Sequence, residues 1–447
     1  MQGRLTPLLL NPLLLALAVV LLIAAPARAE TVTVQRVIVN DLEAWLVEDH
    51  ANPLITVHVA FRGGAAADPD AKAGLARMTA ALLTEGAGEL DSQAFQLRLE
   101  DLAVRLNAAA GQDTVNLTLQ TLRPVREDAF ALMRLALAEP RFDAEPVERV
   151  RSQMQAAVRR ASENPGAEAS RLFNAELFPD HPYGRPSSGT EESLAAIEDS
   201  DLRDFVASRL ARDVMVIGVV GAITPDELRP LLQATFGALP AESAPADVAS
   251  VEPAADGRTV VVDRPFPQST IVFGQPGIAR DHPDYYAALV VNHVLGGGTF
   301  VSRLFHEVRE ERGLAYSVHT SLVPLDRSAL LVGRAATANP RAGETISVIR
   351  EAWRRMAEDG LDAEEVNEAK TYLTGSFPLR FTSSDRIAGI LASMQLQGLG
   401  LDYLQRRNAL VEAVTVDDAN RVARALLQPD RLTTLVLGQP EGVGTTH

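Results

Sequence analysis

The sequence predicts an α+β protein made of two homologous α/β sandwich domains, each an antiparallel-rich sheet with helices packed on one face. The first observation is a repeat, because similar segments recur about 217 residues apart, as Gly221 and Gly438 do. The second is the order within each half, where strand-like runs come first and long helical patterns follow before a final strand. A repeat this long indicates a duplicated domain, since solenoid repeats are about 20 to 50 residues long. Strands followed by helices favour a sheet with helices layered on one face.

In the first half, alternating and β-branched runs predict strands at VIVNDLEAWLVED (Val37 to Asp49) and LITVHVAFRGGAA (Leu54 to Ala66). LNAAAGQDTVNLTLQTL (Leu106 to Leu122) is typical of a hairpin with small residues at one end. Helices are predicted from Asp128 to Pro140 and from Phe142, where the segment FDAEPVERVRSQM begins.

The second half repeats this order. A strand pattern at Arg258 to Gly277 precedes a helical pattern at Asp284 to Gly297. LDAEEVNEAKTYL (Leu361 to Leu373) matches the helix that begins at Phe142, and the closing segment Leu410 to Gly438 matches the one that ends at Gly221. We expect domains at residues 30–240 and 256–447. The linker, residues 241–255, lies in a stretch rich in Pro, Ala and acidic residues without apolar periodicity.

The first 29 residues differ from the rest of the chain. Arg4 precedes an apolar run from Leu13 to Ala25, and Ala27-Arg28-Ala29 fits an A-x-A cleavage site. This pattern predicts a cleavable secretory signal peptide over residues 1–29. The alternative is an uncleaved anchor, but the run is shorter than the roughly 20 residues that span a bilayer. We expect no membrane association after cleavage.

Charge and cysteine content narrow the classes of function. The chain has 42 Lys and Arg residues against 58 Asp and Glu residues and a net charge of −16. Such a chain is a poor nucleic-acid binder, because phosphate contacts rely on a basic surface. It has no cysteine, which excludes disulfides, thiolate metal sites and a cysteine nucleophile. An exported chain without disulfides favours the periplasm of a Gram-negative bacterium.

The segment LGGGTFVSRLFHEVREERGLAYSV (Leu295 to Val318) carries the main candidate site. Its glycine cluster precedes a charged amphipathic helix that Gly313 ends, and a strand with an aromatic residue follows. Arg309 and Tyr316 could present a guanidinium and a phenol to the same peptide. Gly297 and Gly298 fit either a tight turn between helices or a close approach of the backbone to a peptide.

A second segment, AGLARMTAALLTEGAG (Ala73 to Gly88), predicts a helix with the frame of an inverted zinc motif, H-x-x-E-H. Such a helix works because residues i and i+4 share one face and can hold one ion. The motif positions are occupied by Arg77, Ala80 and Ala81. None of the eight histidines lies three or four residues from another. We therefore expect no metal ion to be held by this chain.

These features resemble the pitrilysin/insulinase family of inverted-zincin metallopeptidases, which includes the subunits of mitochondrial processing peptidase. The similarity extends over nearly all of the mature chain and rests on the helix frame after Gly74, on HPYGRPSSGT (His181 to Thr190), on the Leu295 to Val318 segment and on the duplicated layout. The family has a third ligand, a glutamate, on a later helix, and that position is Ala157 here. The resemblance implies that every residue of the catalytic metal site has been replaced.

The resemblance also assigns roles to residues that remain. It implies that the Tyr316 hydroxyl donates to the scissile carbonyl oxygen and that Arg309 holds backbone carbonyls of the substrate. The hairpin edge at Asn107, Ala108 and Ala109 would pair with an extended peptide by β-augmentation.

The function expected from the resemblance is that of a non-zinc, substrate-binding subunit of a heteromeric zinc metallopeptidase in the periplasm. A homologous partner with an intact H-x-x-E-H motif would carry the zinc, so this chain needs no cofactor of its own. One alternative is a non-enzymatic peptide-binding, chaperone or scaffold module of the same fold. Another is an active homodimer with unusual metal ligands.

Overall fold

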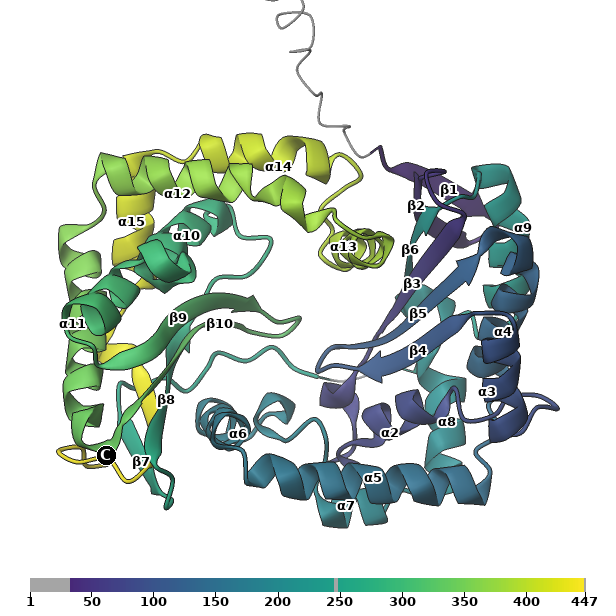
Figure 1. Cartoon of the computed structure of the whole chain (residues 1–447), viewed down its shortest axis with the longest axis horizontal. Coiled ribbons are helices and arrows are strands. Elements are labelled where there is room, and N and C mark those ends of the chain that lie inside the picture. The colour runs from purple at the N-terminus through teal and green to yellow at the C-terminus, as the bar shows by residue number, and fades with distance from the viewer. Residues whose placement is uncertain (1–32, 245–247, 446–447) are drawn as a thin grey trace, which may run out of the picture. The chain divides into compact units, whose positions relative to one another are not determined.

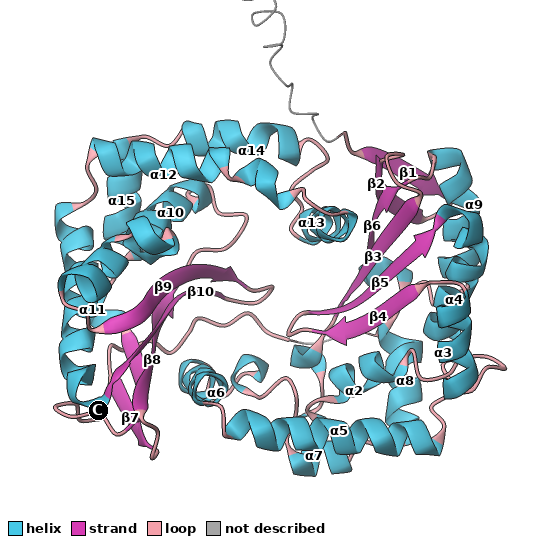
Figure 2. Cartoon of the chain, in the orientation of Figure 1, coloured by secondary structure: helices cyan, strands magenta, loops and turns pink. Residues whose placement is uncertain are grey.

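The computed structural model describes residues 33–244 and 248–445, so the predicted signal peptide lies outside the described residues. The fold that follows is that of the described residues from Val34 onward. It contains two mixed sheets, each with its own helices (Figure 1 and Figure 2). Among the residues described, no helix is both long enough and apolar enough to cross a membrane.

The first sheet has six strands in the order β1-β2-β6-β3-β5-β4. Neighbouring strands are antiparallel except for the parallel pair β2 and β6. The strands are β1 (Gln35–Val39), β2 (Leu42–Glu48), β3 (Leu54–Arg62), β4 (Arg105–Ala110), β5 (Thr114–Leu122) and β6 (Met215–Gly221).

Helices of the first half cover one face of this sheet, where α9 packs on β1 and β2 and α4 packs on β5 (Figure 1). α2 lies against both β4 and α5. The helices are α2 (Leu75–Leu82), α3 (Ser92–Asp101), α4 (Arg126–Ala138), α5 (Ala144–Ser162), α6 (Pro165–Leu177), α7 (Glu191–Ala195), α8 (Asp199–Arg209) and α9 (Pro225–Phe236).

The second sheet has five strands in the order β7-β11-β8-β10-β9. They are β7 (Thr259–Asp263), β8 (Gln268–Pro276), β9 (Ala315–Pro324), β10 (Ala329–Ala338) and β11 (Thr433–Gly438). The helices are α10 (Tyr285–Asn292), α11 (Ala342–Asp359), α12 (Ala363–Gly375), α13 (Ser384–Leu396), α14 (Tyr403–Glu412) and α15 (Val416–Leu426). Two further segments, His293–Gly297 and Phe305–Glu311, are π-helices.

The strand orders confirm the predicted duplication. From β2 onward, the first sheet follows the same sequence of parallel and antiparallel neighbours as the second sheet. The central strands β6 and β11 are almost wholly buried, whereas β5 alternates buried and half-buried residues. Each central strand ends in a glycine with positive φ, Gly221 at 136° and Gly438 at 150°, a conformation that a side chain disfavours. The repeated glycine in the sequence thus marks the same backbone turn twice.

The two halves also exchange helices. α13 from the second half packs on β3 and β6 of the first sheet, and α6 from the first half packs on β8 and β11 of the second. Gly218 allows the first of these contacts, because a Cβ there would lie 2.3 Å from the carbonyl oxygen of Ala388 on α13. In the second contact, Phe173 on α6 is buried together with Val272 and Leu435 in a shared apolar cluster. Each sheet therefore has a helix of its partner half on its other face.

Polar contacts reinforce this junction. The buried Tyr183, within the HPYGRP segment, donates a hydrogen bond from its hydroxyl to Asp113 at 2.7 Å and accepts one from the backbone N–H of Arg327 at 2.9 Å. Burial raises the pKa of the Tyr183 phenol, so it remains a neutral donor. Arg62 pairs with Asp326 at 2.5 Å. The HPYGRP segment is thus a structural connection between the halves.

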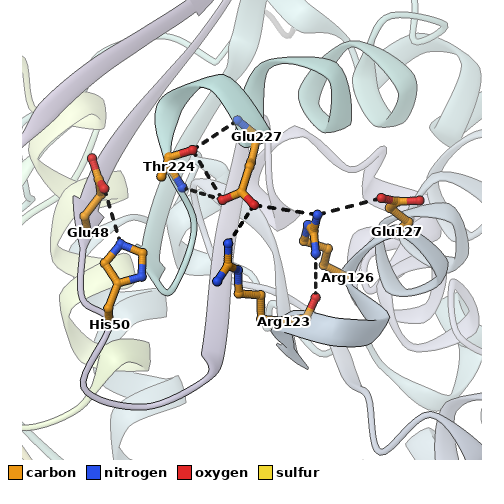
Figure 3. Close-up of polar contacts among 7 residues, drawn as sticks. All are labelled: Glu48, His50, Arg123, Arg126, Glu127, Thr224 and Glu227. Atoms are coloured by element: carbon orange, nitrogen blue, oxygen red, sulfur yellow. Dashed lines mark hydrogen bonds and ion pairs between the residues drawn. The ribbon is translucent and has the colours of Figure 1, made fainter.

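The start of α9 is stabilised by a charged cluster (Figure 3). Thr224 and Glu227 form a reciprocal capping box, and Arg123 donates to the Glu227 carboxylate at 2.8 Å. Arg126 lies 3.7 Å from the same carboxylate. The hydrogen bond from Arg123, together with the backbone N–H of Thr224, holds the pKa of Glu227 at about 2. The carboxylate therefore stays charged, because it accepts hydrogen bonds from Thr224 at the helix start and from Arg123 and forms an ion pair with Arg126.

We predict that Gly218→Ala destabilises the protein by about 1–3 kcal/mol, because the added methyl group forces α13 away from the sheet. Urea unfolding measures this effect. Gly375→Ala is the matched control, because nothing lies within 4 Å of a Cβ built at that helical position. This control should be neutral or slightly stabilising. Equal stabilities of the two variants would contradict the tight contact at Gly218.

We predict that Glu227→Gln lowers stability in a pH-dependent way. A depressed folded-state pKa contributes stability above the unfolded value, 4.5, and that contribution is lost as the pH falls through about 2. The gap in urea midpoint between variant and wild type should therefore be fully present near neutral pH and shrink on acidification below 4.5. Glu127→Gln is the control, since Glu127 is 81% exposed. A gap that is independent of pH would contradict this assignment.

Candidate functional site

Arg309 and Tyr316 lie together, as their spacing in the sequence suggested. Arg309 comes from the π-helix Phe305–Glu311, and Tyr316 is the second residue of β9. The guanidinium carbon of Arg309 is 4.7 Å from the centre of the Tyr316 ring and 4.8 Å from that of Phe305. Tyr316 is 81% exposed. Its hydroxyl is therefore available to a ligand while the ring is held by the stacked guanidinium.

Arg309 differs from the cations around it in having no acidic partner among the residues described. Arg303 forms a bidentate pair with Glu365 at 2.6 Å, and Arg312 pairs with Glu311 at 2.7 Å. His306 is hydrogen-bonded to Glu310 at 2.8 Å. The fork of N–H donors on Arg309 is thus left for backbone carbonyls or a carboxylate of a bound molecule.

Two exposed apolar residues beside this pair were missed by the sequence analysis. Phe300 is 70% exposed and Val301 is 71% exposed. The Phe300 ring meets the Phe305 ring edge-on with centroids 5.0 Å apart, so Phe300, Phe305, Arg309 and Tyr316 form a continuous stack. The only sequence signal was the position of Phe300 and Val301 directly after the glycine cluster. The helix of this segment was predicted, but its π-helical winding was not.

The structure gives the glycines of this segment a packing role. A Cβ at Gly297 would lie 2.5 Å from the side-chain nitrogen of Asn292, and one at Gly298 would lie 2.8 Å from the carbonyl oxygen of His293. Gly298 is buried and Gly297 is half-buried. This geometry fits the tight turn between helices. Contact of Gly297 and Gly298 with a peptide remains a prediction.

The other predicted peptide contact lies on an edge strand. β4 is the last strand of the first sheet, where Asn107 pairs with Thr118 and Ala109 pairs with Asn116 of β5. Asn107 and Ala109 are exposed and Ala108 is half-buried. An edge strand presents backbone donors and acceptors that an extended peptide can use. β-Augmentation at this edge stays a prediction.

The degenerate metal frame is formed by α2 and α5, which pack together. Arg77, Ala80 and Ala81 lie in α2, and Ala157 lies in α5. Arg77 donates a hydrogen bond to the Ser188 hydroxyl at 2.7 Å, while its Nε is buried without a partner. Burial lowers the pKa of this guanidinium. Ser188 and Ala157 both line a cavity of about 620 Å³.

The residues in this frame do not fit a zinc ion. A guanidinium has no lone pair to offer, and it places a positive charge where a cation would sit. The methyl groups of Ala80, Ala81 and Ala157 cannot replace imidazole or carboxylate ligands. Among the described residues, no group of three or more His, Asp, Glu or Cys residues could hold a metal ion.

Comparison with protein families supports the family resemblance that was drawn from the sequence motifs. The family model "Insulinase (Peptidase family M16)" matches residues 44–191, and the model "Peptidase M16 inactive domain" matches residues 196–373. The chain belongs to the M16 peptidase family. The resemblance drawn from the motifs is thereby confirmed, and so is the predicted fold of two homologous α/β domains.

Individual M16 relatives agree. The chain is 27% identical to "Non-peptidase homolog YmxG" of Helicobacter pylori over 87% of this chain and 90% of that protein. It is 32% identical to an uncharacterized zinc protease of Mycobacterium leprae over 60% of each chain. A crystal structure of a peptidase M16 inactive domain from Pseudomonas fluorescens has a TM-score of 0.85 and 29% identity, covering 93% of this chain and 99% of that one. The chain is thus an M16 homologue of zinc proteases that lacks the ligands in its own metal frame.

We predict that the metal frame can be rebuilt. A variant with Arg77→His, Ala80→Glu, Ala81→His and Ala157→Glu should retain about one zinc ion per chain after dialysis, because α2 and α5 would again supply three converging ligands. Metal analysis by mass spectrometry measures the zinc content.

The control for this experiment keeps Ala157 and carries only the three α2 substitutions, which leaves two ligands and should bind zinc far more weakly. A four-substitution variant that folds normally yet holds no zinc would show that the frame itself has been lost.

Proposed function

We propose that this chain is the non-zinc, substrate-binding subunit of a heteromeric M16 metallopeptidase. Its partner is a homologous subunit with an intact H-x-x-E-H motif, and the substrates are peptides or unfolded segments. The observation that carries the proposal is the combination of two sites. The metal frame holds Arg77 and three alanines, whereas Tyr316 is exposed and the half-buried Arg309 has no acidic partner in the described part of the chain.

The pair has chemistry that is useful only beside a reacting peptide bond. The Tyr316 hydroxyl would donate a hydrogen bond to the carbonyl oxygen as negative charge develops there. The Arg309 fork would hold neighbouring backbone carbonyls and so fix the register of the peptide. The stacking of Arg309 on Tyr316 at 4.7 Å orients both groups. The zinc-bearing subunit would supply the metal-dependent part of the reaction.

The exposed apolar residues fit the same proposal. Phe300 extends the row of rings that ends at Tyr316, and Val301, the next residue, is exposed as well. Exposed apolar residues beside a polar pair are typical of contact surfaces. They would contact the peptide or the partner subunit. The leader-like residues 1–29 support action in the periplasm after export.

A second candidate is a peptide-binding module that does not take part in cleavage. The printed name of the Helicobacter pylori relative, a non-peptidase homolog, favours this candidate. The exposed edge of β4 would serve it equally well, because β-augmentation needs no metal. The two candidates differ in whether Tyr316 affects a rate or only an affinity.

We predict that Tyr316→Phe, in the purified complex with the zinc-bearing partner, lowers kcat about 10²-fold with little change in KM, because the hydroxyl acts in the transition state. Arg309→Ala should lower kcat/KM by about tenfold or more, through weaker peptide binding. Hydrolysis of a fluorogenic peptide measures both effects.

Arg312→Ala is the matched control, because it removes a cation of the same helix region that is already paired with Glu311. It should leave activity unchanged. Full activity of a complex that carries both Arg309→Ala and Tyr316→Phe would overturn the proposed mechanism. The second candidate would be favoured if the wild-type chain never forms an active complex and the two substitutions only weaken its binding of peptides.

A further inference from the structure

The second half contains another large cavity, of about 720 Å³. Residues of α10, β9, α12, α13 and α14 line it, and so does Gly297 from the first π-helix. A volume of about 300–1,000 Å³ is usual for sites that bind small ligands. Tyr372 and Leu379 line the cavity and are 54% and 68% exposed, so the cavity opens to solvent beside them.

The charge of this cavity is opposite to that of the chain. The described residues that line it include Arg280, Arg380 and Arg407 but no Asp or Glu. The whole chain has 58 acidic residues against 42 Lys and Arg residues. None of the three arginines forms an ion pair with a carboxylate among the residues described, whereas many other arginines of the chain do.

Arg407 is a buried arginine whose contacts among the described residues are all with neutral groups. The residue is only 5% exposed. One of its terminal nitrogens donates to the Leu373 carbonyl at 2.6 Å and to the Asn408 side chain at 3.0 Å, and its guanidinium lies 4.4 Å from the Phe377 ring centre. These partners are all neutral. A buried charge without a charged partner is unfavourable, and burial accordingly lowers the pKa of Arg407.

Arg280 is enclosed by tyrosines. Its guanidinium lies 4.2 Å from the ring centre of Tyr285 and 5.4 Å from those of Tyr286 and Tyr403. It donates to the Tyr403 hydroxyl at 2.9 Å. The rings orient the guanidinium without neutralising it, because a neutral phenol carries no charge. Burial raises the pKa of Tyr403 to about 12, so that phenol stays neutral at ordinary pH.

The three cations line the same cavity. Burial raises the pKa of the Tyr285 phenol, and the charges of Arg280, Arg380 and Arg407 all act on that phenol in the opposite direction. Arg380 is exposed, and no hydrogen bond or ion pair holds it among the described residues. The other lining residues include the apolar Leu289, Phe377, Ile390 and Met394, together with polar residues such as Asn292, His293, Thr320, Ser393 and Gln397. The cavity thus combines three cations with apolar surface and polar side chains that carry no negative charge.

We propose that this cavity binds a carboxylate attached to an apolar body, such as the C-terminal end of a peptide or a small aromatic acid. The carboxylate lies among Arg280, Arg380 and Arg407 and supplies a counter-charge, since guanidinium forks match carboxylates in geometry. The apolar body lies against Leu289, Phe377 and Met394. This binding needs neither a zinc-bearing partner nor the Arg309–Tyr316 pair. A failed test of the cavity would therefore leave the proposed function untouched, and the reverse also holds.

The test is isothermal titration calorimetry of the purified chain with four probes. They are N-acetyl-Ala-Ala-Ala-Phe as the free acid, the same peptide as its C-terminal amide, N-acetyl-phenylalanine and N-acetyl-phenylalaninamide. We expect at least one free acid to bind with a Kd below about 1 mM. Its amide should bind about tenfold or more weakly, because a charge-assisted interaction is lost. Binding of the peptide acid alone identifies chain ends as the ligand source, and binding of the small acid alone identifies free acids.

Arg380→Gln should weaken binding of the free acid by about tenfold or more. This substitution removes an exposed side chain without a bond to the rest of the described structure, so the variant should fold. Arg424→Gln is the matched control, because Arg424 is an exposed arginine of the same half that does not line the cavity. It should leave the Kd unchanged. Equal binding of acid and amide, an unchanged Kd in Arg380→Gln, or no binding of either acid would overturn the proposal.

Discussion

The exchange of helices between the two halves is the constraint on which the rest of the structure depends. Each sheet has one face covered by its own helices, and its other face meets a helix of the opposite half, α13 on the first sheet and α6 on the second. Gly218 permits one contact and Phe173 fills the other. Because burial of these apolar faces stabilises both halves at once, the α2–α5 frame and the cavity lined by α13 depend on the same packing.

Local sequence patterns were sufficient for much of the fold. The 217-residue repeat and the hairpin from Leu106 to Leu122 can be recognised in the sequence itself, and the structure bears them out. The helix exchange could not be predicted, because Gly218 and Ala388 meet only after both halves have folded. The π-helical winding around Arg309 and the exposure of Phe300 are set by tertiary packing in the same way.

The candidate sites show a similar division. The loss of ligands at Arg77, Ala80, Ala81 and Ala157 follows from the family resemblance, which gives the ligand positions, and from residue type, because none of these side chains can bind zinc. The cavity around Arg407 had no such signal. Its cations come from the loop before α10, from the short 3₁₀ helix Phe377–Arg380 that follows α12, and from α14, which are separate segments of the sequence. A buried charge without a charged partner can be recognised only from the tertiary structure, which shows all of the neighbours of that charge.

We propose above all that this chain supplies Arg309 and Tyr316 to an active site whose zinc ion is held by a homologous partner. The most direct measurement is capture of the tagged chain from its host cells, with zinc content and peptidase activity assayed on the captured complex and on the isolated chain. The account predicts a homologous partner with zinc, and activity only in the complex. A chain that is captured alone, holds no zinc and binds peptides without cutting them would contradict it.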